Sequence, residues 1–187
     1  MKNKINFIFD TETNGLHNCS VLSISFIICQ EDKILDKQTR YYFPKENYYN
    51  KHAIAVNGLE KEVIEKHRED INYPFYFEDD YNWLVDIFNE FKVNNIVSHN
   101  TNFDLKFLPN KIKTKIENQE YSTFCTMQLN RDITPNNKAP KLIEACEIYG
   151  IDFDESNAHS SDYDTLKAYE LFVKTMIKRE WRQYGRY

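Results

Sequence analysis

Acidic side chains occur near the start of the chain at a spacing that would let them share a cation. Asp10 and Glu12 lie in the segment FDTET, directly behind the apolar run INFIF. Residues two apart in a strand point to the same face, so both carboxylates would project together and repel each other unless a cation lay between them. A solvated strand end is the plainer interpretation, but it fits poorly behind so apolar a strand. This spacing therefore predicts a metal site.

Two later segments carry further candidates. Asp104 ends the segment SHNTNFD, where a short apolar strand leads into a helix; an acid there also suits a helix N-terminus without any function. Asp164 begins the apolar pattern of the last helix, and His159 precedes it by five residues. A lone loop histidine is more often simply exposed. Each segment alone is weak evidence for a functional site. The order of the three segments along the chain is stronger evidence.

Clustered carboxylates can bind divalent cations, which activate a bound water and stabilise developing negative charge. Hard oxygen ligands favour Mg²⁺ or Mn²⁺ over zinc. A histidine can take the water's proton near neutral pH. The four cysteines are far apart without a CxxC pair, which argues against a zinc site or a disulfide framework.

The elements that must position these residues follow from hydrophobic periodicity and turn residues. Strands are expected at 5–9, 21–29, 37–43 and 95–98, the first three as an antiparallel meander. Helices are expected at 59–67, 80–92, 102–108, 142–149 and 162–181. A solvated acidic loop is expected at 70–80, a strand end leading into a short helix at 124–129, and a loop at 135–140. Strands followed by alternating helices and strands predict an α/β fold, a mixed sheet with helices on its faces.

Length and composition set the broad class. The 187 residues, 41% hydrophobic and 28% charged, fit one domain covering 1–187. No apolar run reaches the roughly 20 residues of a membrane span, and none resembles a secretory signal, so we expect a cytoplasmic protein without a membrane partner. The net charge of −5 argues against binding nucleic acid by bulk electrostatics, but not against holding a strand end through metal ions.

In this order the three motifs resemble those of the DEDDh 3′→5′ exonucleases, a family that includes the DnaQ-like proofreading subunits and ribonuclease T. The matching segments are FDTETNGL (9–16), SHNTNFDLKFL (98–108) and AHSSDYDTLKAYEL (158–171), flanked by AVNGLEKEV (55–63) and KLIEACEIYGI (141–151). The resemblance covers nearly the whole chain. It implies a ribonuclease H-like fold, with a mixed β-sheet whose first three strands are antiparallel and whose later strands are parallel.

The resemblance also implies residue roles. The metal-binding carboxylates would be Asp10, Glu12, Asp104 and Asp164, with His159 as the general base. The family's histidine comes five residues before its last aspartate, which selects Asp164 over Asp162. Contacts to the terminal nucleotides would come from Thr11, Thr13, Leu16 as an apolar wedge, Phe103 and Phe107, although core packing explains the two phenylalanines equally well. The chain departs from many relatives at Cys125-Thr126, where they carry Asp-Thr, and segment 44–57 has no clear counterpart.

The expected function is therefore a two-metal 3′→5′ exonuclease that releases mononucleotides from single-stranded or frayed DNA, using Mg²⁺ or Mn²⁺. Its expected partner is a single-stranded nucleic-acid 3′ end. An exoribonuclease and a proofreading subunit beside a DNA polymerase remain alternatives. A catalytically silent binding module would be expected to lack one of the five residues, and all are present. An EF-hand-like cation binder is not supported, because no DxDxDG spacing occurs.

The last helix carries cations whose role the sequence leaves open. Lys174, Lys178 and Arg182 follow each other at intervals of four, beside an apolar stripe of Val173, Ile177, Trp181 and Tyr184. The plainer interpretation is that the stripe packs on the sheet and the cations complement the helix C-terminus. Alternatively, the cations guide the nucleic-acid backbone toward the site.

Overall fold

Five strands form one mixed sheet in the order β3-β2-β1-β4-β5. The computed structural model describes residues 3–46, 48–69 and 71–184, with side chains up to Arg179. The strands are β1 (Ile5–Thr13), β2 (Val21–Gln30), β3 (Lys33–Tyr41), β4 (Asn95–Ser98) and β5 (Ser122–Cys125). The first three pair antiparallel, whereas β4 runs parallel to β1 and β5 parallel to β4. The predicted mixed sheet is confirmed, and β1 extends four residues beyond the predicted strand.

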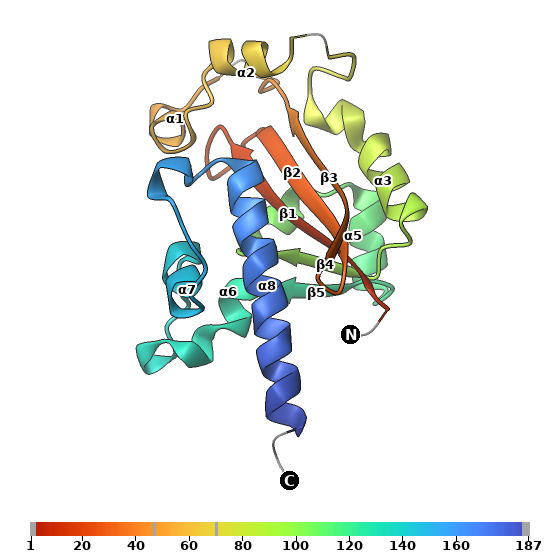
Figure 1. Cartoon of the computed structure of the whole chain (residues 1–187). Helices are drawn as coiled ribbons and strands as arrows, with labels where there is room; N and C mark the ends of the chain where they lie inside the picture. The colour runs from red at the N-terminus through yellow and green to blue at the C-terminus, as the bar shows by residue number, and fades with distance from the viewer. Residues whose placement is uncertain (1–2, 47, 70, 185–187) are drawn as a thin grey trace.

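Helices cover both faces of this sheet (Figure 1). The α-helices are α1 (Lys51–Asn57), α2 (Lys61–His67), α3 (Tyr81–Glu90), α4 (Thr101–Asp104), α5 (Asn110–Glu117), α6 (Thr126–Leu129), α7 (Leu142–Ile148) and α8 (Ser161–Tyr184). Short 3₁₀ turns occur at Phe77–Asp80, Leu105–Phe107, Arg131–Ile133, Pro135–Asn137 and Glu155–Asn157. No helix in the described part of the chain is long and apolar enough to cross a bilayer.

The alternation of side chains along β1 divides the core into two layers. Phe7 and Phe9 pack with Phe88 of α3 and Ile112 of α5 on one face. Ile8 points to the other face, where Phe172 of α8 completes a second cluster. Because side chains alternate along a strand, the even-numbered residues of β1 face α8. This parity determines which acidic residues of β1 meet the last helix.

Two segments differ from the sequence-based expectations. The unassigned stretch 44–57 contains α1, whose N-cap Asn50 accepts hydrogen bonds from the backbone N–H of His52 and Ala53. The acidic stretch near residue 80 was predicted to be a solvated loop, and this was wrong for Asp80. Its buried carboxylate forms a 2.6 Å ion pair with Arg40 and accepts a 2.8 Å hydrogen bond from Tyr42. A helix that the periodicity did not indicate, α5, packs on the core through Ile112.

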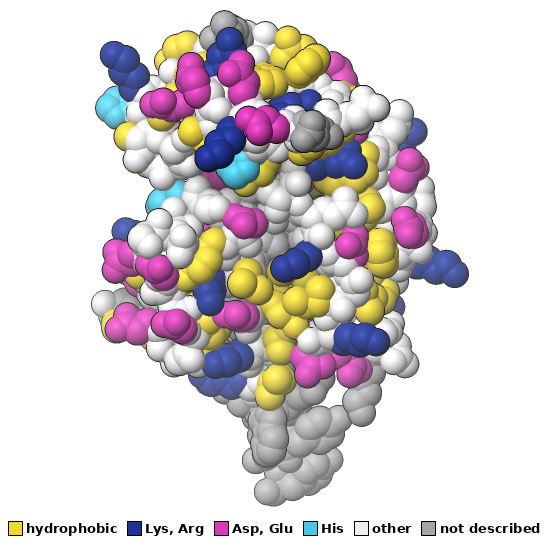
Figure 2. All heavy atoms as spheres, turned by 45° about the horizontal axis from the view of Figure 1, so that its top comes forward, with side chains coloured by type: hydrophobic (Ala, Val, Ile, Leu, Met, Phe, Trp, Pro, Cys, Tyr) yellow, Lys and Arg dark blue, Asp and Glu magenta, His cyan; other side chains and the backbone are white. Residues whose placement is uncertain are grey.

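The surface in Figure 2 carries Lys and Arg side chains interspersed with Asp and Glu. This mixture agrees with the net charge of −5. A protein that holds nucleic acid mainly through its backbone phosphates presents a basic stripe instead. Among the described residues, the face seen in Figure 2 carries no such stripe.

Candidate active site

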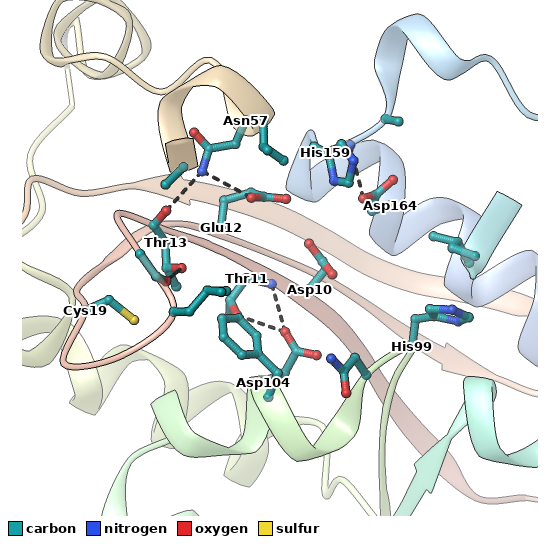
Figure 3. A pocket seen from close by; sticks show the side chains of 18 of the residues that line it. Asp10, Thr11, Glu12, Thr13, Cys19, Asn57, His99, Asp104, His159 and Asp164 are labelled. Carbon is teal, nitrogen blue, oxygen red and sulfur yellow. Dashed lines mark hydrogen bonds between the residues drawn. The ribbon is translucent and has the colours of Figure 1, made fainter. Parts of the chain in front are cut away.

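The three acidic motifs converge on one open cleft with a volume of about 1180 Å³. Its walls come from the end of β1 and the loop behind it, from α1, from the start of α4, from the segment before α7, and from the start of α8. Figure 3 shows the acidic side chains pointing toward one another across this cleft. The carboxylates are those of Asp10, Glu12, Asp104 and Asp164. Segments more than 150 residues apart thus contribute to one cluster.

Small side chains on β2 let the last helix approach closely enough to bring Asp164 into the cleft. Ser23 donates a 2.9 Å hydrogen bond to Ser161 at the first residue of α8. One turn later, the Thr165 hydroxyl donates to the backbone carbonyl of Ser25 at 3.2 Å. Because Asp10 and Glu12 have the parity that faces α8, Asp164 arrives opposite them. In the sequence, Ser23 and Ser25 interrupt an apolar strand. In the fold, the Ser23 hydroxyl and the Ser25 carbonyl hold α8 against β2.

Asp104 reaches the cluster from the opposite side and is held there by β1. The carboxylate is 2% exposed, and its Oδ1 accepts two hydrogen bonds from Thr11, one from the backbone N–H at 3.2 Å and one from the hydroxyl at 2.8 Å. The short helix α4 follows β4 after two residues, so the strand position fixes where Asp104 lies. Thr11 therefore orients an acidic neighbour, and its amide and hydroxyl are already engaged.

His159 stands at the rim of the cleft and is exposed, unlike the carboxylates behind it. Its φ of +64° lies in the left-handed region, which few non-glycine residues adopt and which is concentrated at functional sites. Its backbone N–H donates to Asp164 Oδ2 at 3.2 Å. One ligand atom each from Glu12, His159 and Asp164 lie within 4.8 Å of one another. This geometry allows His159 to act as a base or as a metal ligand.

Crowding and burial make every member of the cluster a stronger proton binder. Burial, then the charge of Asp104, raises the pKa of Asp10 well above its ordinary value. Burial raises the pKa of Glu12 to about 8, against the lowering effect of a hydrogen bond from Asn57. Burial likewise raises the pKa of Asp104 and that of Asp164 to about 6 each. Four carboxylates in this state destabilise one another unless protons or cations are bound.

Two carboxylate oxygens of the cluster provide the test of whether metal ions fit. Asp10 Oδ2 and Asp164 Oδ1 are buried and have no hydrogen-bond partner among the described residues. A buried acceptor without a donor is costly and uncommon in folded proteins. Oxygen ligands on four acids are what Mg²⁺ and Mn²⁺ prefer. The donor set, its burial and its unsatisfied oxygens all fit divalent cations.

The residues predicted to contact nucleotides are distributed differently. Thr11, Thr13, Leu16 and Phe103 line the cleft, and Leu16 is 74% exposed at its mouth. Phe107 is not among the lining residues. It packs on the core beneath Phe103, with an edge-to-face ring distance of 5.2 Å. Of the two phenylalanines, Phe103 is therefore the one placed to meet a ligand.

The sequence did not indicate the structural role of His99 in the second motif, whose ring contacts two segments of the cleft wall. Nδ1 lies 2.9 Å from the Thr126 hydroxyl and Nε2 lies 3.2 Å from the Pro140 carbonyl. The carbonyl can only accept, so Nε2 carries the proton and Nδ1 accepts from Thr126. Burial lowers the pKa of His99 to about 4, which keeps the ring neutral. The partner of His99 is thus Thr126, the threonine that this chain shares with relatives carrying Asp-Thr, and not the departing Cys125. The separation of 27 residues between His99 and Thr126 leaves no local signal of this contact.

Comparison with known proteins agrees with this geometry. A family model described as "Exonuclease" (RNase_T) matches residues 7–172. The chain belongs to this exonuclease family. The predicted relationship to the DnaQ-like 3′→5′ exonucleases is confirmed.

Two curated relatives and one solved structure are similar to this chain. Ribonuclease T of Buchnera aphidicola subsp. Baizongia pistaciae is 30% identical over 195 residues, covering 95% of this chain and 85% of that enzyme. "DNA polymerase III PolC-type" of Ureaplasma parvum serovar 3 is 24% identical over 182 residues, 95% of this chain but only 12% of the polymerase. The nuclease domain of 3′hExo, a DEDDh family member bound to rAMP, has the same ribonuclease H-like fold, with a TM-score of 0.67, 14% identity and 95% of each chain covered.

Proposed function

We propose that this exonuclease removes mononucleotides from the 3′ end of a single strand by two-metal-ion hydrolysis. The observation that carries the proposal is the convergence of four carboxylates from three distant segments, with unpartnered oxygens on Asp10 and Asp164. Structural acids are normally paired with cationic or hydrogen-bonding side chains, whereas here acids face acids. Such an arrangement is useful when divalent ions supply the missing positive charge.

The residues that would hold the ions are Asp10, Glu12, Asp104 and Asp164. Two divalent ions bound there would supply an activated water and charge stabilisation at the leaving oxygen. His159, which reaches the cleft from its rim, would take the proton from the attacking water. Water's oxygen bonds to phosphorus as the bond from phosphorus to the 3′ oxygen of the penultimate nucleotide breaks. The products are a nucleoside 5′-monophosphate and a strand shorter by one nucleotide.

Two apolar side chains of the cleft support the proposal of a free strand end as substrate. Leu16 projects into the opening, where an apolar side chain can separate the terminal base from its neighbours. Phe103 also lines the cleft and offers a ring for a base to stack on. An unpaired terminus can enter between them, whereas a paired one must first fray. We therefore propose single-stranded or frayed ends as substrates.

The sugar specificity is a separate proposal with two candidates. DNA is our first proposal, and the PolC-type polymerase relative supports it. RNA is the second, and it is favoured by the ribonuclease T relative, which matches over most of its own length. A contact to the 2′-hydroxyl would distinguish them. A polymerase partner for this chain is a further proposal, suggested by that same polymerase.

Labelled strands test the function directly. Purified protein is incubated with Mg²⁺ and 5′-labelled or 3′-labelled strands of DNA and of RNA, single-stranded and paired. We expect a 3′ label to be released at once as mononucleotide, and a 5′-labelled strand to shorten in a ladder. A closed circular single strand is the control and should remain intact. Cutting of the circle, or full activity in EDTA, would contradict the proposed mechanism.

A further inference from the structure

The Glu12 carboxylate is held by a side chain from a different element. Asn57, the last residue of α1, donates from Nδ2 to Glu12 Oε2 at 3.2 Å. The same nitrogen donates to the backbone carbonyl of Thr13 at 3.1 Å. Figure 3 shows this carboxamide reaching down to the end of β1 from the helix above it. Both of its donors are thus used at the strand that carries Asp10 and Glu12.

The orientation of the Asn57 carboxamide is fixed from its other side. Its Oδ1 accepts a 3.1 Å hydrogen bond from the backbone N–H of Leu59. Between them Gly58 has a φ of +68°, in the left-handed region, and its N–H closes α1 on the Ile54 carbonyl at 2.8 Å. The oxygen therefore has a backbone donor, and the nitrogen must face Glu12. The turn after α1 presents the amide in one orientation.

A second set of hydrogen bonds connects the segment before α1 to the loop that follows β1. The Asn14 side chain donates to the Tyr48 carbonyl at 2.7 Å and accepts from the backbone N–H of Ser20 at 2.7 Å. The segment from Tyr48 to Asn57 is therefore fastened at both ends to β1 and its following loop. Asn50 caps the start of α1 without touching the carboxylates. The position of Asn57 does not depend on a single contact.

We propose that Asn57 is a positioning residue that holds Glu12 in the orientation needed to bind a metal ion. This inference rests on the proposed metal-binding role of Glu12. Glu12 faces Asp10 and Asp164, and like charges push its carboxylate away from them when no ion is bound. The amide donors of Asn57 oppose this displacement and leave Glu12 Oε1 available for an ion. Partners that orient a metal ligand typically change metal affinity or activity by roughly 10–100-fold when removed.

Variants of Asn57 with a matched control on the same helix test the proposal. Asn57→Ala removes the whole amide. Asn57→Ser keeps an oxygen that can accept from the Leu59 N–H, but is too short to reach Glu12. Asn50→Ala removes a side chain of the same type at the other end of α1, where it caps the helix. Mn²⁺ binding to the full chain is measured by the electron paramagnetic resonance signal of free Mn²⁺, and the melting temperature in EDTA reports folding.

We expect both Asn57 variants to bind Mn²⁺ at least about 10-fold more weakly than the wild type. Asn50→Ala should remain within about twofold, because its hydrogen bonds do not reach Glu12. At a limiting Mn²⁺ concentration, kcat of the Asn57 variants should fall while KM for the strand stays within about threefold. In a Glu12→Gln background, Asn57→Ser should cause no further loss of Mn²⁺ affinity, because the partner is already changed.

Three results would overturn the inference. Two of them leave the proposed function intact, and the third removes it as well. Wild-type Mn²⁺ affinity in a folded Asn57→Ser variant would show that the amide does not position Glu12. Equal weakening in Asn50→Ala would assign the effect to helix α1 as a whole. Absence of Mn²⁺ binding in the wild type would instead remove the proposed function together with this inference.

Discussion

The carboxylates of the cluster differ in their immediate partners, and this decides what each substitution should do. Asp104 is held by two hydrogen bonds from Thr11, and Glu12 by one from Asn57. Asp10 and Asp164 each keep one buried oxygen without a partner. Their substitution should therefore relieve repulsion as well as remove a proposed metal ligand. His159 differs again, because it is exposed at the rim of the cleft and its ring lies near Glu12 and Asp164.

Replacing His159 separates proton transfer from metal holding. We expect His159→Ala to lower the single-turnover rate in Mg²⁺ on the order of 10²–10⁴-fold, as for a lost general base. Mn²⁺ affinity should stay within about threefold, because the four carboxylates remain. Binding titrations and rapid-quench kinetics measure the two properties. A parallel loss of Mn²⁺ binding would make His159 a ligand, which its place near Glu12 and Asp164 also allows.

Replacing Asp10 with Asn should stabilise the protein in the absence of metal. A raised pKa means that the folded state binds the proton more tightly, so stability is highest below the unfolded pKa and is lost as pH rises. The pKa of Glu12, about 8, sets the upper end of this window. In EDTA, Asp10→Asn should be more stable than the wild type by about 1–3 kcal/mol at pH 8, with a smaller gain at pH 5. Melting curves at both pH values measure this difference.

That same variant should lose activity and its stabilisation by Mn²⁺. The trade between stability and function is expected where a site keeps like charges together. A variant less stable than the wild type at pH 8 in EDTA would mean that Asp10 contributes packing or hydrogen bonds that outweigh the repulsion. Asp104→Asn offers the comparison, because its oxygen is already satisfied by Thr11 and should show a smaller gain.

Helix α8 makes two separate sets of contacts along its length, one near its start and one further along. Its first turn is fastened to β2 through Ser161 and Thr165, which positions Asp164. Further along, Lys174 donates to the carbonyls of Tyr149 and Gly150 at 3.0 and 3.3 Å, and Lys178 lies 4.8 Å from the Tyr149 ring centre. These contacts favour the structural interpretation of the cations. Ile177 is 49% exposed, so the expected apolar stripe is not fully covered, and Trp181, Arg182 and Tyr184 lie outside the described side chains.

Substituting the cations of α8 distinguishes support of α7 from guidance of a strand. We expect Lys174→Gln with Lys178→Gln to lower the free energy of unfolding by roughly 0.5–1.5 kcal/mol, through lost hydrogen bonds to the end of α7. The salt dependence of strand binding, measured by anisotropy in Ca²⁺, should not change. Lys141→Gln at the cleft is the contrast and should reduce the salt slope by about 1. A flatter slope in the Lys174 and Lys178 variant would support the guiding role instead.

For the whole molecule, we expect the clustering of negative charge to make the stability of the fold depend on divalent cations. The chain has a net charge of −5, and the carboxylates of Asp10, Glu12, Asp104 and Asp164 form one cluster in the cleft. Repulsion within the cleft lowers the stability of the folded state alone, because the unfolded chain separates these residues. If the proposed cations bind, they would remove this repulsion and bind the folded state selectively. Folding and metal binding would then be linked through one equilibrium.

Thermal unfolding with and without metal tests this linkage. At a Mn²⁺ or Mg²⁺ concentration 100 times the dissociation constant, stabilisation should be about 2.7 kcal/mol, or about 5–10 °C at this chain length. Ca²⁺ should also raise the melting temperature but support little turnover, because its looser coordination suits the in-line geometry poorly. EDTA should abolish both the shift and the activity. A melting temperature that is the same in EDTA and in Mn²⁺ would contradict metal binding at the cluster.

The sequence alone determined the parts of this protein that depend on local pattern. Alternation and apolar runs gave the first three strands, and the helix near 80–92 matches α3 closely. The motif order gave the family, and the spacing of Asp10 and Glu12 placed them on one strand face. Hydrophobic periodicity did not predict α1, because a helix of seven residues is too short to show an apolar period. This helix depends instead on its Asn50 cap and on the turn at Gly58.

Only the tertiary structure decided which polar residues act together. Asn57, His99, Ser23 and Asp80 each have partners 27 to 138 residues away, and no local pattern records such a separation. Their hydrogen bonds exist because the sheet order places β4 beside β1, and because serines on β2 admit α8. The same packing removes water from the carboxylates and raises the pKa of each. Residue types can be read along a chain, but burial and proximity arise only when its segments pack.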